Sequence, residues 1–244
     1  MKAIFKRELN AYFKSPVGYV FVGLYLAFSA LMFMMNNALF ATSDMTGYFS
    51  YMCYIFIVIV PILTMKMFSE ERKLKTDQLL LTAPVKVSDI VLGKFLSALS
   101  VLGISVGITL LYLVFLKFYG NPAVIQSFIG YLGILLYGAM LISIGMFIST
   151  LTQNQIISAI STLALLGILS FIEGFTLDFT GLFNGKLLFL GKLLNGAIEF
   201  LTINARFYDF AKGTLNIVPL VYFLSITALF IILTVRVIER RRWR

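Results

Sequence analysis

The sequence predicts an all-α membrane protein with six transmembrane helices. Of the 244 residues, 60% are hydrophobic and only 13% are charged, and the mean hydropathy is +0.95. Soluble domains carry about 25% charged residues, whereas about 20 consecutive apolar residues in a helix cross the hydrocarbon core of a bilayer. Within a single membrane domain, residues 1–244, the expected transmembrane helices are 17–35, 48–67, 92–116, 128–151, 155–173 and 214–236.

Residues 1–15 are expected to form an amphipathic helix that lies on the membrane surface. One face is apolar and the other carries Lys2, Lys6, Arg7, Asn10 and Lys14, a pattern typical of interfacial helices. The apolar face consists of Ile4, Phe5, Leu9, Tyr12 and Phe13. The Ser15-Pro16 step then interrupts the helix and allows an elbow before the first span.

The basic residues predict the orientation in the membrane. Residues 1–14 contain 4 Lys and Arg, residues 66–94 contain 6 and residues 236–244 contain 5, which makes 15 of the 20 in the chain. Because cytoplasmic segments of membrane proteins are enriched in Lys and Arg, both termini and the 69–89 loop are expected to be cytoplasmic. The net charge of +9 therefore indicates topology and not nucleic-acid binding.

The extracytoplasmic loop is expected at 174–213, with re-entrant or interfacial helices before the last span. It mixes acidic and basic residues with short apolar groups. Glu173 and Asp178, near the membrane edge, are candidate outer gate residues. We expect them to cap an outer helix or to shape an entrance, and a catalytic role for the pair is a weaker alternative.

Two features within the apolar segments suggest how helices pack. Pro61 lies near the inner end of the second span, where it is expected to kink the helix, either as a hinge or as a packing feature. Gly103 and Gly107 form a GxxxG pair that would let another helix approach closely.

The residue types that are missing argue against an enzyme. The chain has no His, which excludes His-dependent triads and common zinc-hydrolase motifs. The Gly-Lys pairs at 93–94, 185–186 and 191–192 are each followed by Phe or Leu, so none completes a GxxxxGK[ST] phosphate-binding loop. No catalytic, cofactor-binding or metal-binding residue is therefore predicted, and any energy for transport is expected to come from another subunit.

A charged loop at 69–89 carries the clearest functional signal. Thr76 is suited to cap a short helix that ends at Pro84, and Ser88 and Asp89 are expected to cap the next helix. The short helix would expose Leu79, Leu80 and Leu81, each at a cost of about 1.5–3 kcal/mol if left in water. These leucines could dock into a groove on a soluble subunit or lie in the lipid interface.

This loop resembles the segment after the second span of ABC-2 type transporter permeases. The shared order is an acidic pair, a basic residue, a Thr, a Leu-rich turn, a Pro and a Gly-Lys pair. The corresponding residues are Glu70, Glu71, Arg72, Thr76, Leu79, Leu80, Leu81, Pro84, Gly93 and Lys94. Lys75 and Gln78 stand where the family often has Gly and Glu, so no salt bridge is carried over to these two positions.

The end of the chain resembles the subgroup of these permeases that is associated with gliding motility. The residues that carry this second resemblance are Phe207, Phe210, Lys212, Gly213, Tyr222, Phe223, Arg241, Arg242 and Trp243.

The resemblance implies a permease subunit of an ATP-driven exporter in the inner cell membrane of a prokaryote. It implies a second permease copy or paralogue and separate ATPase subunits that bind ATP and Mg. Residues 76–83 would form the coupling helix. The residues expected to couple the ATPase are Glu70, Glu71, Arg72, Thr76, Leu79, Leu80, Leu81, Pro84 and Lys94.

Two other classes of function stay open, as does the substrate. A membrane scaffold that recruits a soluble partner without transport would also explain the leucine-rich loop. An intramembrane enzyme is disfavoured because no catalytic set is evident. The apolar spans carry no substrate signal, and lipid, peptide, drug, sodium and polysaccharide substrates are all compatible with the sequence.

Overall fold

The structure of the chain is a computed structural model that describes residues 1–76, 85–120, 122–171 and 202–242. The described residues form helices and connecting turns, with no strand among them. The helices are α1 (Lys2–Lys14), α2 (Pro16–Phe33), the π-helical turn η1 (Met34–Ala38), α3 (Thr46–Thr64), α4 (Ser69–Lys73), α6 (Val87–Thr109), α7 (Leu111–Tyr119), α8 (Val124–Leu151), α9 (Gln155–Phe171), α12 (Ile203–Ala211) and α13 (Ile217–Arg242).

Among the described residues, five helical stretches are long and apolar enough to cross a membrane. They are Pro16–Ala38, Thr46–Lys73, Val87–Phe118, Val124–Leu151 and Ile217–Arg242. The fifth predicted span, 155–173, corresponds to α9, which is apolar but has only 17 residues. The structure therefore confirms an all-helical membrane protein, whereas the number of six spans stays a prediction.

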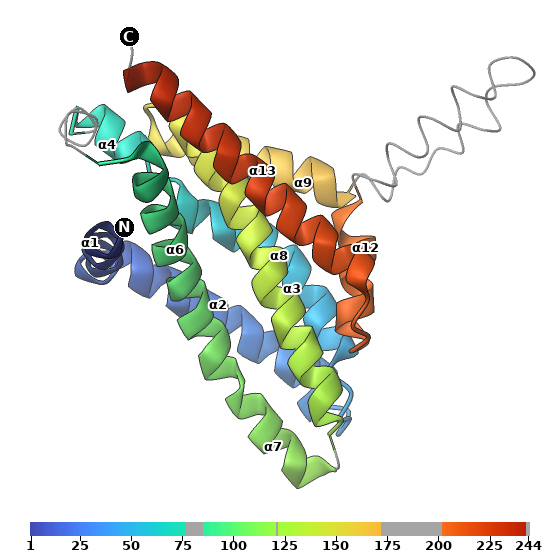
Figure 1. Cartoon of the computed structure of the whole chain (residues 1–244). Helices are drawn as coiled ribbons and strands as arrows, with labels where there is room; N and C mark the ends of the chain where they lie inside the picture. The colour runs from blue at the N-terminus through green and yellow to red at the C-terminus, as the bar shows by residue number, and fades with distance from the viewer. Residues whose placement is uncertain (77–84, 121, 172–201, 243–244) are drawn as a thin grey trace, which may run out of the picture.

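The central helix is α8, which packs against α3, α6, α9, α12 and α13 (Figure 1). Three of its glycines, Gly130, Gly138 and Gly145, lie where a Cβ atom would collide with the side chains of Phe49, Leu102 and Thr64 respectively. Their lack of a side chain lets the neighbouring helices approach closely, as small residues do between transmembrane helices.

The predicted GxxxG pair packs against no other helix among the described residues. A Cβ atom added at Gly103 or Gly107 would meet no atom within 4 Å, so no helix of the described chain approaches there. The helix that carries the pair, α6, begins at Val87 and has Lys86 as its N-cap. The prediction that Ser88 and Asp89 cap this helix is therefore wrong, because both residues lie inside its first turn.

The path from α6 to α7 is interrupted between Thr109 and Leu111. The hydroxyl of Tyr131 on α8 donates a hydrogen bond of 2.7 Å to the carbonyl of Thr109. A backbone carbonyl that loses its helical partner inside a membrane needs another donor. Tyr131 supplies one, and it also links the interruption to the central helix. By contrast, α3 continues through Pro61 to Thr64.

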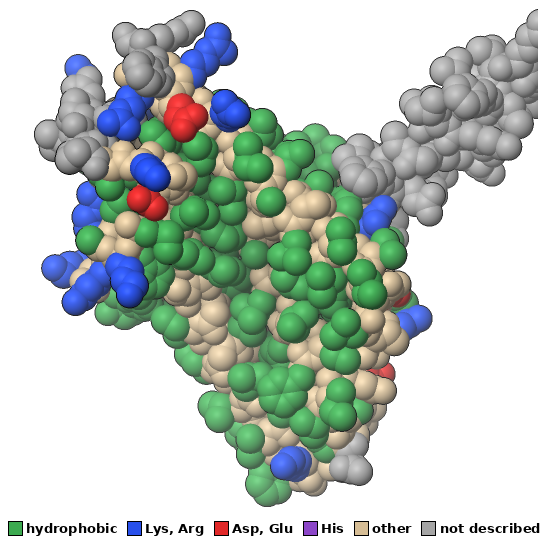
Figure 2. All heavy atoms as spheres, in the orientation of Figure 1, with side chains coloured by type: hydrophobic (Ala, Val, Ile, Leu, Met, Phe, Trp, Pro, Cys, Tyr) green, Lys and Arg blue, Asp and Glu red, His purple; other side chains and the backbone are tan. Residues whose placement is uncertain are grey.

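Charged and apolar side chains occupy different parts of the surface (Figure 2). Lys and Arg gather at the end formed by α1, α4, the start of α6 and the C-terminal part of α13, which we call the basic end (Figures 1 and 2). Large exposed apolar side chains cover the body, among them Leu31, Val58, Leu111, Ile160 and Leu224. An apolar surface of this kind is expected where helices face lipid.

Replacing Gly145 by Val tests the close packing of α8. The new side chain would collide with buried Thr64, and overpacking of this kind costs about 1–3 kcal/mol. We expect a lower melting temperature in detergent, measured by the loss of the monodisperse chromatographic peak on heating. Gly23→Val is the matched control, because Gly23 is exposed on α2 with open space beside it. Equal melting temperatures for the two variants would contradict the packing role.

Candidate functional site

The most unusual feature of the basic end is the buried ammonium group of Lys94. This side chain lies on α6 and is only 2% exposed. Its Nζ donates hydrogen bonds of 2.9 Å to Glu8 Oε2 on α1 and 2.8 Å to Glu71 Oε1 on α4. It also lies 5.2 Å from the centroid of the Phe68 ring. A buried cation requires such pairing, so Lys94 joins three helices at one point.

Arg7 completes this set of charges. Its guanidinium pairs with Glu8 and lies 3.5 Å from Glu71 Oε1, although the Arg7 side chain is half exposed. The four residues Arg7, Glu8, Glu71 and Lys94, which we call the charge cluster, therefore contain two cations and two anions. Their charges balance, which reduces the free-energy cost of placing them together at a buried position.

The charge cluster keeps Glu8 ionised. Burial by itself would raise the pKa of Glu8, but the positive charge of Lys94 and the hydrogen bonds from Arg7 and Lys94 hold the pKa below its ordinary value. A lowered pKa in the folded protein means that the carboxylate stabilises the fold above the pKa of the unfolded chain. That contribution is lost as the pH falls through the lower, folded-state pKa.

Close packing holds α1 in position for these contacts. A Cβ atom at Gly93 would lie 2.9 Å from Cγ2 of Ile4, so the absence of a side chain at Gly93 lets α1 rest on α6. The hydroxyl of Tyr12 donates a 3.2 Å hydrogen bond to the carbonyl of Leu63 at the end of α3. Burial raises the pKa of Tyr12, and the hydroxyl therefore keeps its proton.

The apolar face of α1 is directed at the protein. Ile4, Leu9 and Phe13 are partly buried and pack against the core, while Lys2, Lys6 and Lys14 are exposed. The amphipathic helix predicted from the sequence is present, and its location at the membrane surface stays a prediction.

The end of α4 is a defined helix stop. The N–H of Thr76 donates to the carbonyl of Glu71 at 2.9 Å, and the N–H of Lys75 donates to that of Arg72 at 3.2 Å. These two bonds form the Schellman arrangement. Lys75 has a φ of 57°, a left-handed conformation that glycine adopts most readily. The family's preference for Gly at this position therefore has a conformational explanation.

The hydroxyl of Thr76 bonds back to the carbonyl of Glu71 at 3.3 Å, so this side chain takes part in ending α4. Leu79, Leu80, Leu81 and Pro84 lie outside the described residues, as do Glu173 and Asp178, the candidate outer gate residues. The helix predicted after Thr76 thus stays a prediction.

The beginning of α4 and the end of α8 are joined by hydrogen bonds. Ser149 Oγ accepts hydrogen bonds from the N–H groups of Phe68 and Ser69, each at 3.1 Å. The first N–H groups of a helix have no partner within the helix, so Ser149 supplies the missing acceptor. Arg72 Nη1 donates to the carbonyl of Leu151 at 3.1 Å. Of the predicted residues, Arg72 therefore contacts α8, and Glu70 forms a partly exposed ion pair with Lys66 at 3.7 Å.

The basic tail contacts the same region. Arg241 donates to the carbonyl of Thr150, and Arg242 Nη1 donates to the carbonyl of Val85 at 3.2 Å. The basic residues near the end of α13 thus hold two backbone segments of the basic end, the last turn of α8 and the residues before α6.

Glu8 is the site residue that the sequence prediction missed. It is the sole acidic residue among residues 1–14, which carry four basic ones. A lone acidic residue in a basic segment was the available signal. Its partner Lys94 is 86 positions away, and no local pattern connects the two.

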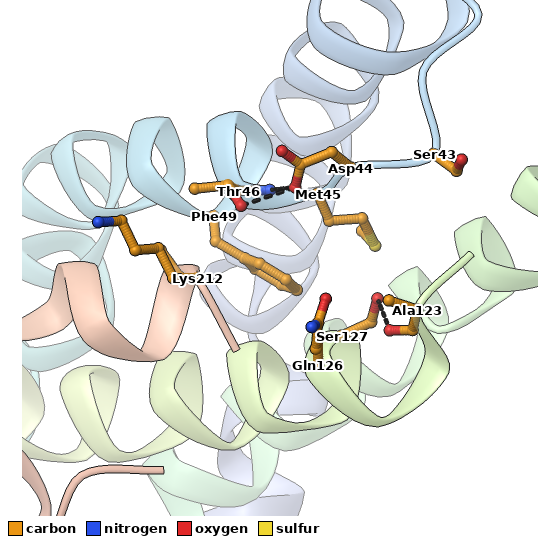
Figure 3. Close-up of a pocket in the computed structure, with 10 residues that line it drawn as sticks. Ser43, Asp44, Met45, Thr46, Phe49, Ala123, Gln126, Ser127 and Lys212 are labelled. Atoms are coloured by element: carbon orange, nitrogen blue, oxygen red, sulfur yellow. Dashed lines mark hydrogen bonds between the residues drawn. The ribbon is translucent and has the colours of Figure 1, made fainter. Parts of the chain in front are cut away.

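A hollow of about 220 Å³ lies at the opposite end, between α3, α8 and α12 (Figure 3). Asp44 Oδ1 accepts hydrogen bonds from the N–H and the hydroxyl of Thr46, at 2.9 and 2.6 Å, and so supports the start of α3. Lys212 lies on another wall, with its Nζ 4.4 Å from the centroid of the Tyr208 ring. In the part of the chain described, no group of His, Cys, Asp and Glu is placed to hold a metal ion.

An all-helical bundle with five long apolar helices, an apolar body and one basic end defines a multi-pass membrane protein. The family model described as "ABC-2 family transporter protein" matches residues 3–243, nearly the whole length. The chain therefore belongs to the ABC-2 transporter family and is a transmembrane component of an ABC transporter. A comparison with curated proteins gives no match.

Membership of this family confirms the resemblance found in the 69–89 loop. It also implies a partner ATPase and a subunit that is not itself catalytic. The likeness to the gliding-motility subgroup stays a prediction.

Removing the Lys94 ammonium tests the charge cluster. We expect Lys94→Met to lower the stability by about 3–5 kcal/mol, because two largely buried carboxylates would lose their buried cation and keep only the half-exposed Arg7 as a counter-ion. The triple variant Glu8→Gln, Glu71→Gln, Lys94→Met should recover much of the lost melting temperature. Lys66→Met is the control, since Lys66 is far less buried than Lys94 and its single pair with Glu70 is partly exposed, and near-surface pairs contribute only about 0–1 kcal/mol. A Lys94→Met variant as stable as Lys66→Met would show that the cluster does not hold the helices together.

Replacing Lys75 by Gly tests the left-handed helix stop. Glycine adopts a positive φ without steric cost, so Lys75→Gly should raise the stability by about 0.5–1 kcal/mol. Lys73→Gly, inside the last turn of α4, should lower it by a similar amount. Thermal unfolding in the same detergent measures both changes. An unchanged or lower melting temperature for Lys75→Gly would be inconsistent with the observed backbone conformation.

Proposed function

We propose that this chain is the permease subunit of an ATP-driven exporter and that the charge cluster transmits motion from the ATPase to the membrane helices. The observation that carries the proposal is the position of Lys94, which bonds to α1 and α4 from within α6. In this proposal ATP and Mg bind to the separate ATPase subunit, and the basic end faces the cytoplasm in accordance with its Lys and Arg content.

The segment between α4 and α6 is suited to this role because both of its ends are fastened. On one side, Glu71 bonds to Lys94, and Arg72 bonds to the end of α8. On the other side, the carbonyl of Val85 accepts from Arg242 of α13. A force applied between these points would reach α6, α8 and α13 together. Such contiguous contacts can carry coupling between distant sites.

A cavity beside the charge cluster supports contact with a second protein at this end. It has a volume of about 370 Å³ and lies between α1, the end of α3 and α4. Its walls combine the apolar side chains of Met67 and Leu74 with the charged groups of Arg7, Lys66 and Glu70. A mixed surface of this kind suits an apolar side chain of the ATPase that is flanked by polar groups.

The complete transporter in this proposal contains two permease subunits and two ATPase subunits. The second permease is another copy of this chain or a paralogue. The assembly lies in the inner membrane of a prokaryotic cell, with both termini of the chain in the cytoplasm. ATP-driven closure of the ATPase pair would press on residues 76–83 and displace α6 and α8.

Replacing Leu80 by Asp tests the proposed coupling. The chain is purified from native membranes in mild detergent with its bound soluble partner, and ATP hydrolysis is measured after reconstitution. We expect Leu80→Asp to keep membrane insertion and to reduce the permease-dependent ATPase stimulation by about tenfold. This factor corresponds to about 1.4 kcal/mol. Leu215→Asp is the control, since Leu215 is 57% exposed at the opposite end.

Full stimulation in the Leu80→Asp variant would rule out docking through this segment. Recovery of the chain with a soluble partner that lacks nucleotide-binding motifs would favour the alternative function, a scaffold that does not transport.

A further inference from the structure

A third cavity lies between α3 and α12, away from the basic end. Its volume is about 430 Å³, which is within the usual range for small-molecule sites. The lining residues come from one face of each helix: Ser50, Cys53 and Tyr54 on α3, and Asn204, Ala205, Phe207 and Tyr208 on α12. Cys53 is seven residues into α3, or about 10 Å along the helix axis. The cavity therefore lies within the length of a candidate membrane span.

A fixed amide group provides the polar side of this cavity. Asn204 Oδ1 accepts a 3.0 Å hydrogen bond from the hydroxyl of Tyr137, and Asn204 Nδ2 donates at 3.2 Å to the carbonyl of Ser170. One N–H of the amide is left for a ligand. Ser50 donates to the carbonyl of Thr46 at 2.8 Å, so its oxygen can still accept. The cavity thus offers one oriented donor and one acceptor.

The remaining lining is apolar or aromatic. Phe207 and Cys53 are 1% and 2% exposed and form the closed side. Tyr54 and Tyr208 are exposed at the opening, and Tyr54 is supported by Phe171 of α9, with 6.2 Å between ring centroids. Aromatic walls with a few placed polar groups are typical of sites for small amphipathic molecules.

The described lining of the cavity disfavours a charged ligand. No Lys, Arg, Asp or Glu is among the described residues that line it. A charged group would lose hydration there without gaining an ionic partner from these residues, at a large cost in free energy. The nearby ammonium of Lys212 is already placed over the Tyr208 ring. An uncharged head group with hydroxyls or amides avoids this cost and matches Asn204 and Ser50.

We propose that the cavity between α3 and α12 binds one uncharged amphiphile, with its apolar part against Phe207 and Tyr54 and its polar head at Asn204 and Ser50. If the chain is an exporter, as proposed above, the bound amphiphile belongs to the class of molecules that it transports. Only this last step rests on the proposed function. The binding itself does not depend on transport, and the two can be tested separately.

Photolabelling tests the site directly. The full-length chain in nanodiscs is irradiated with a diazirine-bearing monoacylglycerol, and the modified residues are identified by mass spectrometry. We expect adducts on residues 50–54 and 204–208. Ala205→Trp, which places a bulky side chain in the cavity, should reduce them at least fivefold. Ala30→Trp is the matched control, since Ala30 is exposed on α2, and it should leave the labelling unchanged.

Two further probes test the selectivity of the cavity. A diazirine alkyl glucoside added from water should also label the cavity if any uncharged amphiphile fits, whereas labelling by the monoacylglycerol alone would indicate a bilayer lipid as the source. A diazirine fatty acid, which carries a carboxylate, should label the cavity at least fivefold less. Equal labelling by the charged probe, or labelling that Ala205→Trp does not change, would overturn the proposal.

ATPase measurements separate this proposal from the proposed function. If the site holds substrate, the monoacylglycerol should increase ATP hydrolysis by the complete transporter, and Ala205→Trp should abolish the increase. Specific labelling of a chain that copurifies with no ATPase would support the binding site and refute the proposed ATP-driven exporter function. An ATPase complex whose cavity is not labelled would support the proposed function and refute the binding site.

Discussion

The ammonium group of Lys94 determines how the basic end is assembled. A cation that is 2% exposed needs both carboxylates within hydrogen-bond distance, and these come from two other helices. The positions of α1, α4 and α6 therefore depend on one another. Gly93, the preceding residue, lets α1 approach closely enough for Glu8 to reach. Gly93 thus provides the space for α1 against α6, and Lys94 provides the ionic contact that holds it there.

The structure also contains a polar junction of a different kind within the apolar body. Tyr137 on α8 bonds to Asn204 on α12, which bonds to the backbone of α9. Tyr137 is surrounded by the rings of Phe56, Phe207 and Phe223. A neutral hydrogen-bonded junction suits this environment, because an ion pair at this depth would cost more in desolvation. The chain thus uses charges at its basic end and neutral amides and hydroxyls inside the bundle.

Hydropathy predicted the helical membrane class, because that class depends on local composition. The charge cluster depends on contacts between residues far apart in sequence, such as Glu8 and Lys94, and no local periodicity reveals these. Lys94 lies inside the predicted span 92–116, and its burial follows from the packing of α1 and α4 against α6. Lys75 shows the same limit: its departure from Gly suggested a changed charge contact, whereas the backbone indicates a φ preference.

The hydrogen bond between Arg242 and the carbonyl of Val85 connects the last turn of α13 to the residues that precede α6. Purification handles and fluorescent fusions are often placed at a C-terminus on the assumption that it is inert. In this protein a bulky fusion there would pull on the residues that precede α6. A fusion partner at this end is therefore a perturbation in its own right, and a long spacer is needed to make it neutral.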